Sequence, residues 1–137
     1  LLRGPFALGK MQRALDMCIS WSKQRHTFGK PLAERQAIQW KLVDMYTDIQ
    51  SLRALTYQMA ARYDQGEDIR VEAGLIKLTS MDWGARCLDH GIQIHGAMGE
   101  SLELPLTLFY RYLRHGQIGG GTSEIQRMQI ARKLLKD

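Results

Sequence analysis

Cysteine and proline are scarce in this sequence, which holds two cysteines and three prolines among 137 residues. Cys18 and Cys87 lie far apart, and neither belongs to a Cys/His pattern with the spacing of metal ligands. Buried free thiols in a reducing compartment are therefore the main interpretation, with a disulfide or a catalytic cysteine as the alternatives. No metal site is predicted.

Long apolar runs and long basic runs are missing as well. No stretch approaches the ~20 apolar residues that a membrane-spanning helix needs, and no secretory signal layout opens the chain. The formal net charge is +5, but basic residues alternate with acidic ones along most of the chain. We expect neither a membrane span nor nucleic-acid binding.

Strand-like alternation is also absent, whereas helical periodicity of three and four runs through most of the chain. Helices are expected over residues 6–26, 38–63, 71–94 and 122–136, with a short helix after Pro105. The predicted fold is all-α: one domain over residues 1–137, an antiparallel four-helix bundle with one short extra helix. The inward face of the third helix is expected to comprise Val71, Leu75, Leu78, Ala85, Leu88 and Ile92.

The chain opens without Met and already in helical rhythm, so we expect a fragment of a longer protein. The joints between its helices carry most of the functional information. The first joint reads RHTFGKPLAERQ, from Arg25 to Gln36. An arginine offers a fork of donors suited to a diphosphate, and an aromatic and an amide suit an adenine. Alternatively, Arg25 satisfies the carbonyls of its own helix and Phe28 staples the turn; spacing alone favours neither.

The second joint reads QIHGAMGE, from Gln93 to Glu100. Gly96 and Gly99 suit left-handed positions at a helix C-terminus, and they would also let a ligand or another chain approach the backbone. A plain helix cap is the simpler explanation of either glycine alone. His95 is expected to be a helix-end histidine rather than a metal ligand.

The third joint reads GGGTSEIQ and begins with three consecutive glycines. They precede a helix N-terminus, whose free N–H groups and partial positive charge suit a phosphate. In the structural alternative, Thr122 or Ser123 caps the helix and Glu124 complements its dipole. Three glycines exceed what a cap needs, so either a large group passes close to the backbone or the loop moves.

In three ordered motifs the chain resembles the C-terminal helical domain of the acyl-CoA dehydrogenase family: R-x-x-F-G with a later Gln, Q-I-x-G-x-x-G, and G-T-S-E-I-Q-R followed by I-A-R. The motifs occur at the family's separations over essentially the whole chain. The resemblance implies an FAD enzyme that oxidises an acyl-CoA thioester to the 2-enoyl-CoA and passes electrons to an electron-transfer flavoprotein. It implies a homodimer or homotetramer with this chain as the last domain, in the bacterial cytoplasm or the mitochondrial matrix.

The resemblance also implies roles for individual residues. Arg25 matches the arginine on the FAD diphosphate, and Gly121 matches a glycine that lines the acyl-CoA site. Residues 93–97 match the segment that reaches the FAD of the neighbouring subunit. The full set of implied cofactor-binding residues is Arg25, Thr27, Phe28, Gln36, Gln93, Ile94, His95, Gly96, Ala97, Thr122, Ser123 and Glu124.

Three departures from the family pattern stand out. The usual catalytic glutamate aligns with Gly120, so no catalytic residue is assigned within the chain. In the long-chain and isovaleryl branches the base comes from the first helix, at a position two residues before Leu1. Ala97 replaces a second glycine, and Tyr112 replaces the Asp that usually follows Arg111. A flavin-dependent oxidase or monooxygenase of the same fold, or a non-catalytic helical interaction module, are the alternatives.

Overall fold

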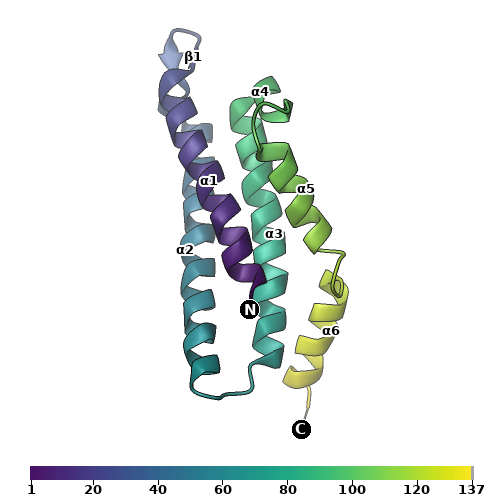
Figure 1. Cartoon of the computed structure of the whole chain (residues 1–137). Helices are drawn as coiled ribbons and strands as arrows, with labels where there is room; N and C mark the ends of the chain where they lie inside the picture. Colours follow the sequence, from purple (N-terminus) through teal and green to yellow (C-terminus); the bar gives the residue numbers. More distant parts are fainter. Residues whose placement is uncertain (137) are drawn as a thin grey trace.

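The computed structural model describes residues 1–136 and consists almost entirely of helices (Figure 1). This confirms the predicted all-α fold class. The elements in chain order are α1 (Arg3–Gln24), β1 (His26–Thr27), β2 (Lys30–Pro31), a single 3-10 turn (Leu32–Glu34), α2 (Gln36–Asp64), α3 (Arg70–His95), α4 (Ala97–Glu100), α5 (Leu106–Gly116) and α6 (Ser123–Leu134).

The helices run up and down beside one another, with α3 in the middle (Figure 1). Helix α3 contacts α1, α2, α5 and α6. The fourth position of the bundle is shared, because α5 and α6 follow one another along the same side of α3 (Figure 1). The short helix expected after Pro105 corresponds to α5, which with 11 residues is nearly as long as α6 with 12.

The central position of α3 overturns part of the expected inward face. Of the six residues expected to face inward, only Ala85 and Leu88 are buried. Glycines take much of the close contact instead: a Cβ on Gly84 would lie 2.8 Å from Leu113 of α5. A helix with neighbours on several sides has no single apolar stripe, since small residues let the neighbouring helices approach.

The core lies between α1, α2 and α3 and extends to α5. Its large, fully buried side chains include Met11, Met45, Met81, Ile49 and Leu88. Cys18 and Cys87 are free thiols and are buried, which confirms the burial expected of the cysteines. Within the described residues, none of the helices combines the length and apolarity that crossing a membrane requires.

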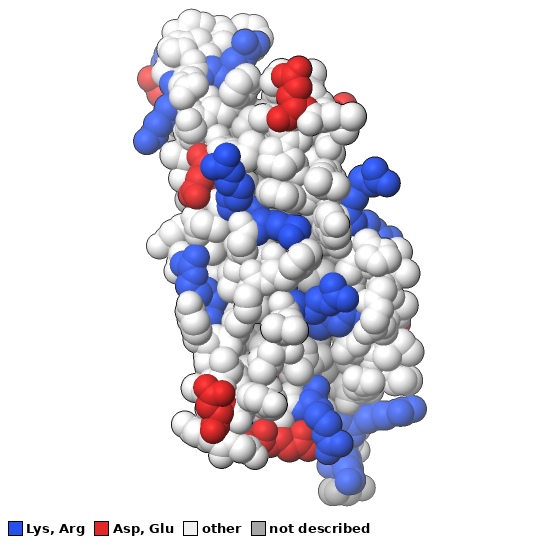
Figure 2. All heavy atoms as spheres, in the orientation of Figure 1, with Lys and Arg blue, Asp and Glu red and all other residues white. Residues whose placement is uncertain are grey.

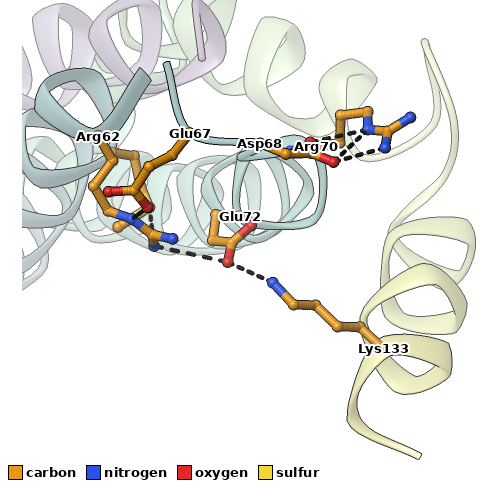
Figure 3. A network of polar contacts seen from close by, with 7 residues as sticks. Arg62, Glu67, Asp68, Arg70, Glu72 and Lys133 are labelled. Carbon is orange, nitrogen blue, oxygen red and sulfur yellow. Dashed lines mark hydrogen bonds and ion pairs between the residues drawn. The ribbon is translucent and has the colours of Figure 1, made fainter. Parts of the chain in front are cut away.

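A network of ion pairs links α2, α3 and α6 at the end of the bundle where the chain turns from α2 into α3 (Figure 3). Glu72 near the start of α3 accepts from Lys133 of α6 at 2.6 Å and lies 3.7 Å from Arg62 of α2. Arg62 also bonds Glu67 in the turn at 2.7 Å. Exposed pairs of this kind contribute ~0–1 kcal/mol each, so the network orients α6 more than it stabilises the fold.

Charge on the surface is dispersed. On the face drawn in Figure 2, Lys and Arg side chains stand singly or in small groups between uncharged residues, with acidic side chains among them. That face therefore offers scattered positive charges rather than a continuous basic stripe.

Candidate functional site

The first joint is a tight hairpin, which the sequence did not predict. His26 pairs with Pro31 and Thr27 with Lys30, so the expected plain turn contains a two-residue connection made by Phe28 and Gly29. Both residues have positive φ, 49° and 76°. A two-residue turn that matches the twist of its strands requires this at both central positions.

Phe28 stands at the tip of this hairpin with 98% of its surface exposed. The expected alternative, in which Phe28 staples the turn, is therefore wrong, since a staple needs apolar contact. A bulky aromatic residue at positive φ is also energetically unfavourable. Phe28 therefore adds little to the packing of the described residues.

Arg25 and Arg35 divide the work at this joint. The backbone N–H of Arg25 caps α1 by donating to the Trp21 carbonyl at 2.8 Å, while its exposed guanidinium bonds no other described residue. Arg35 was missed by sequence reasoning: its Nη2 donates to the Thr27 carbonyl at 2.6 Å and fixes the loop. The one sequence signal for this bond was the position of Arg35 immediately before the second long helix. Gln36, the first residue of α2, is exposed.

At the second joint, Gly96 and Gly99 have different tasks. Gly96 has φ 61° and ψ −140°, a conformation open in practice to glycine alone, and nothing lies within 4 Å of where its Cβ would be. Gly99 lies within α4 and has no positive φ, so its expected left-handed role is wrong. A Cβ there would strike the backbone of Ile92, so Gly99 lets α4 pack against the end of α3.

His95 is buried beneath this joint, as expected of a helix-end histidine. Its Nδ1 lies 2.8 Å from the Gly91 carbonyl, which can only accept, so Nδ1 carries the proton. The ring stacks on Trp21 with centroids 5.4 Å apart and 23° between the planes. This stack joins the end of α3 to the end of α1.

The first two joints meet at one end of the bundle, where the hairpin and α4 lie (Figure 1). They share a cavity of about 360 Å³. Seven of the predicted site residues line it, together with Trp21, Leu32 and Met98: Arg25, Thr27, Gln93, Ile94, His95, Gly96 and Ala97. Phe28 and Gln36, also predicted, are not part of its lining.

The third joint lies elsewhere, between α5 and α6 against the lower half of α3 (Figure 1). Thr122 caps α6, with its Oγ1 accepting from the Ile125 N–H at 3.4 Å. Glu124 follows in the first turn. Its own backbone N–H, and then the Thr122 hydroxyl, lower the pKa of the Glu124 carboxyl. The structural alternative for these residues, with a cap at Thr122 and an acidic residue in the first turn, is thus confirmed.

Asp82 of α3 organises this joint, and sequence reasoning missed it. Its carboxylate accepts from Gln117 Nε2 at 3.1 Å, Ser123 Oγ at 3.4 Å and Arg127 Nη2 at 2.9 Å. A second cavity of about 280 Å³ opens here. Its lining comprises Asp82, Arg114, Gln117, Ile118, Thr122, Ser123, Glu124 and Arg127.

The glycine loop itself turns sharply. Gly120 and Gly121 have φ 69° and 89°. The side-chain atom nearest to this position is cationic: Arg3 Nη2 lies 3.6 Å from where a Gly120 Cβ would be. The carboxylate expected from the first helix, two residues before Leu1, lies outside the described residues. Lys77 of α3, also missed, donates to the Gly119 and Gly120 carbonyls of this loop at 2.9 Å and 3.0 Å.

Comparison with known proteins identifies the family. The family model described as "Acyl-CoA dehydrogenase, C-terminal domain" matches residues 1–135. This chain belongs to the acyl-CoA dehydrogenase family. It is 39% identical to the mitochondrial short-chain specific acyl-CoA dehydrogenase of Rattus norvegicus, in a match that covers 95% of this chain and 32% of that enzyme.

Solved structures with the same helical fold include an acyl-CoA dehydrogenase and the FAD-binding protein PigA. Butyryl-CoA dehydrogenase from Megasphaera elsdenii matches with a TM-score of 0.93 and 36% identity, over 98% of this chain and 35% of that one. The FAD complex of PigA matches with a TM-score of 0.90 and 27% identity, over 96% of this chain and 34% of that one. The chain thus spans about a third of the length of these relatives and corresponds to their helical C-terminal domain.

Proposed function

We propose that this chain is the C-terminal domain of a three-domain, FAD-dependent acyl-CoA dehydrogenase. The complete enzyme would oxidise an acyl-CoA thioester to the 2-enoyl-CoA, with an electron-transfer flavoprotein as electron acceptor, in the bacterial cytoplasm or the mitochondrial matrix. The observation that carries the proposal is the cavity shared by Arg25, Thr27 and residues 93–97. Two motifs far apart in sequence meet there, as one ligand spanning both requires.

The residues around this cavity fit the ADP portion of FAD. The Arg25 guanidinium lines the cavity and suits a diphosphate, because its planar fork donates two parallel hydrogen bonds. The backbone at Gly96 has open space where a side chain would stand, so a ligand can approach it closely. Phe28, exposed at the hairpin tip, would add an aromatic face. When bound, FAD supplies the hydride-accepting chemistry.

The two cavities serve different flavins in this proposal. Gln93 lines the first cavity and Asp82 the second, and they are eleven residues apart on α3, which corresponds to roughly 16 Å at ~1.5 Å per residue. The cavity with Arg25 would hold the FAD of a neighbouring subunit. Thr122, Ser123 and Glu124 would lie beside the FAD of their own subunit, with Gly121 against the acyl-CoA.

This arrangement requires self-association as a homodimer or homotetramer. Helix α2 offers a surface for it: Trp40, Val43, Tyr46 and Tyr57 are each more than half exposed. Large apolar and aromatic side chains are enriched in the buried centres of protein interfaces. A face of this kind is suited to contact another copy of the protein.

Residue 120 cannot supply the catalytic base, because Gly120 carries no side chain to take a proton. The position two residues before Leu1 remains our candidate, so we expect residues 1–137 alone to be inactive. Reduction of an electron-acceptor dye by this chain alone with an acyl-CoA would contradict that expectation.

The test of the proposed function is the flavin content of Arg25→Ala in the complete polypeptide. Loss of a charge-assisted bond to the diphosphate, worth ~1.5–3 kcal/mol, should weaken FAD binding by about ten- to a hundredfold. Lys23→Ala, another exposed basic residue at the end of α1, is the control and should retain its flavin. Unchanged flavin in Arg25→Ala would argue against the site.

Gly120 keeps two other functions open. Without a carboxylate at this position, a flavin-dependent oxidase or monooxygenase of the same fold, or a non-catalytic interaction module, remains compatible with the chain. Oxygen consumption in place of dye reduction would favour the oxidase or monooxygenase. A complete protein that neither binds FAD nor consumes an acyl-CoA would favour the interaction module.

A further inference from the structure

Lys77 is a buried cation without a carboxylate partner. It lies on α3 with 9% of its surface exposed, and no Asp or Glu among residues 1–136 forms an ion pair with it. Its ammonium group instead donates to three consecutive carbonyls: Gly119 at 2.9 Å, Gly120 at 3.0 Å, and Gly121. An ammonium has three donors, so this loop satisfies all of them.

These bonds determine which way the loop's peptide groups face. A peptide unit is planar, and its N–H points opposite to its C=O when the bond is trans, as every bond in the described chain is. Since the carbonyls of residues 119–121 turn toward Lys77, the N–H groups of Gly120, Gly121 and Thr122 turn away from it. No acceptor among residues 1–136 bonds these three N–H groups.

The glycines make this geometry possible. Gly120 and Gly121 both take positive φ, which side chains strongly disfavour. Gly119 has no positive φ, and a Cβ there would come closest to Nε2 of the exposed His115 side chain, at 2.9 Å. Gly120 and Gly121 are thus the positions at which the loop needs glycine to turn its carbonyls toward one ammonium.

We propose that Lys77 is a positioning residue for the reaction, which holds the Gly119–Gly121 loop with its free N–H groups facing the substrate side. The proposal rests on the proposed function, in which Gly121 lines the acyl-CoA site. Lys77 itself does not touch the substrate. It acts through the backbone, and the N–H groups that it orients are donors for an electronegative oxygen placed against the loop.

The charge of Lys77 matters as well as its length. Methionine has a similar length but no donor, so Lys77→Met would leave the three carbonyls that face it without this partner. The loop would relax by rotating those peptides, and the N–H groups would rotate with them. Glutamine keeps two donors and should hold the loop in part.

The experiment compares Lys77→Met and Lys77→Gln with Lys41→Met in the complete polypeptide. Lys41 is a partly buried lysine of α2 for which the structure shows no hydrogen bond to this loop, and its variant is the control. Hydrogen exchange of the Ser123 N–H, which donates to the Gln117 carbonyl across the loop at 3.0 Å, should quicken on the order of tenfold or more in Lys77→Met, with α2 unchanged. Turnover of the acyl-CoA should fall by about 10²-fold in kcat with KM nearly constant, as for a misplaced reacting group.

Unchanged exchange in the loop of Lys77→Met would overturn the proposal, and so would a rise in KM with kcat intact. If Lys77→Met does not fold, Lys77→Gln decides the matter, with intermediate loop exchange as the expected result and wild-type exchange as the contrary one. If the wild-type protein turns over no acyl-CoA but its loop still loosens in Lys77→Met, the proposed function fails while the role of Lys77 in holding the loop stands.

Discussion

At the scale of single residues, the most informative positions are those whose side chain lies in an unfavourable environment. Phe28 exposes its large apolar side chain to solvent and adopts a left-handed backbone conformation. Lys77 is the opposite case, a buried charge whose cost is offset by three carbonyls. The resemblance in sequence pointed to Phe28, but nothing in the sequence marks Lys77, because its partners lie more than forty residues away.

A substitution at Phe28 separates the backbone strain of this residue from the contribution of its ring to flavin binding. In Phe28→Asn the backbone strain is relieved, since Asn tolerates the left-handed region, so we expect stability to rise by up to ~1 kcal/mol. Flavin retention in the complete polypeptide should fall at the same time, because the aromatic face is lost. Thermal unfolding and flavin absorbance measure the two effects. A stable variant with full flavin content would remove Phe28 from the site.

At the scale of elements, periodicity predicted the helices well and their ends less well. The first helix was expected over residues 6–26 and is observed from Arg3 to Gln24. Pro5 is compatible with a helix start, because the first turn has no N–H partners to lose. The helix ends early because His26 and Thr27 pair in the hairpin. This pairing spans too few residues to leave a strand-like pattern in the sequence.

The glycines inside the helices allow a matched test. A Cβ at Gly99 meets the Ile92 backbone, whereas nothing lies within 4 Å of a Cβ at Gly9 in α1. We expect Gly99→Ala to destabilise the fold by ~1–3 kcal/mol through overpacking of α4 on α3. Gly9→Ala should stabilise it by ~0.5–1 kcal/mol through helix propensity. Denaturant unfolding compares the two, and equal effects would contradict the packing described here.

At the scale of the whole molecule, the sequence predicted an all-α bundle and two of the residue groups that meet in one cavity. It could not predict that α5 and α6 share one position, because periodicity does not reveal which helix a segment packs on. For the same reason, the ring of donors around Asp82 was missed. Its members come from α3, from the segment after α5 and from α6.

The two thiols report on the integrity of the entire fold. Burial raises the pKa of Cys18 from 9.0 to about 12 and also raises that of Cys87. A raised pKa means that the native state keeps a proton which the unfolded state releases. The resulting contribution to stability is therefore complete below pH 9 and is lost progressively as the pH rises toward about 12.

We therefore expect the free energy of unfolding to decline above pH 9 by up to ~1.4 kcal/mol per pH unit for each thiol. Denaturant titrations at pH 8, 9 and 10 measure this. The double variant Cys18→Ala/Cys87→Ala should show a shallower decline. Native protein at pH 8 should also leave both thiols unmodified by a thiol reagent until denaturant is added, and rapid labelling without denaturant would contradict their burial.

Helix α3 runs without interruption from Arg70 to His95, and this continuity has a mechanical consequence. It bears Asp82 in the lining of one cavity and Gln93 to His95 in the lining of the other, and its Lys77 bonds the glycine loop. A stiff rod of this length transmits a slide or a rotation from one of its ends to the other. A movement of one end of α3 would therefore be accompanied by a movement of the other end, and with it of the residues that line the second cavity.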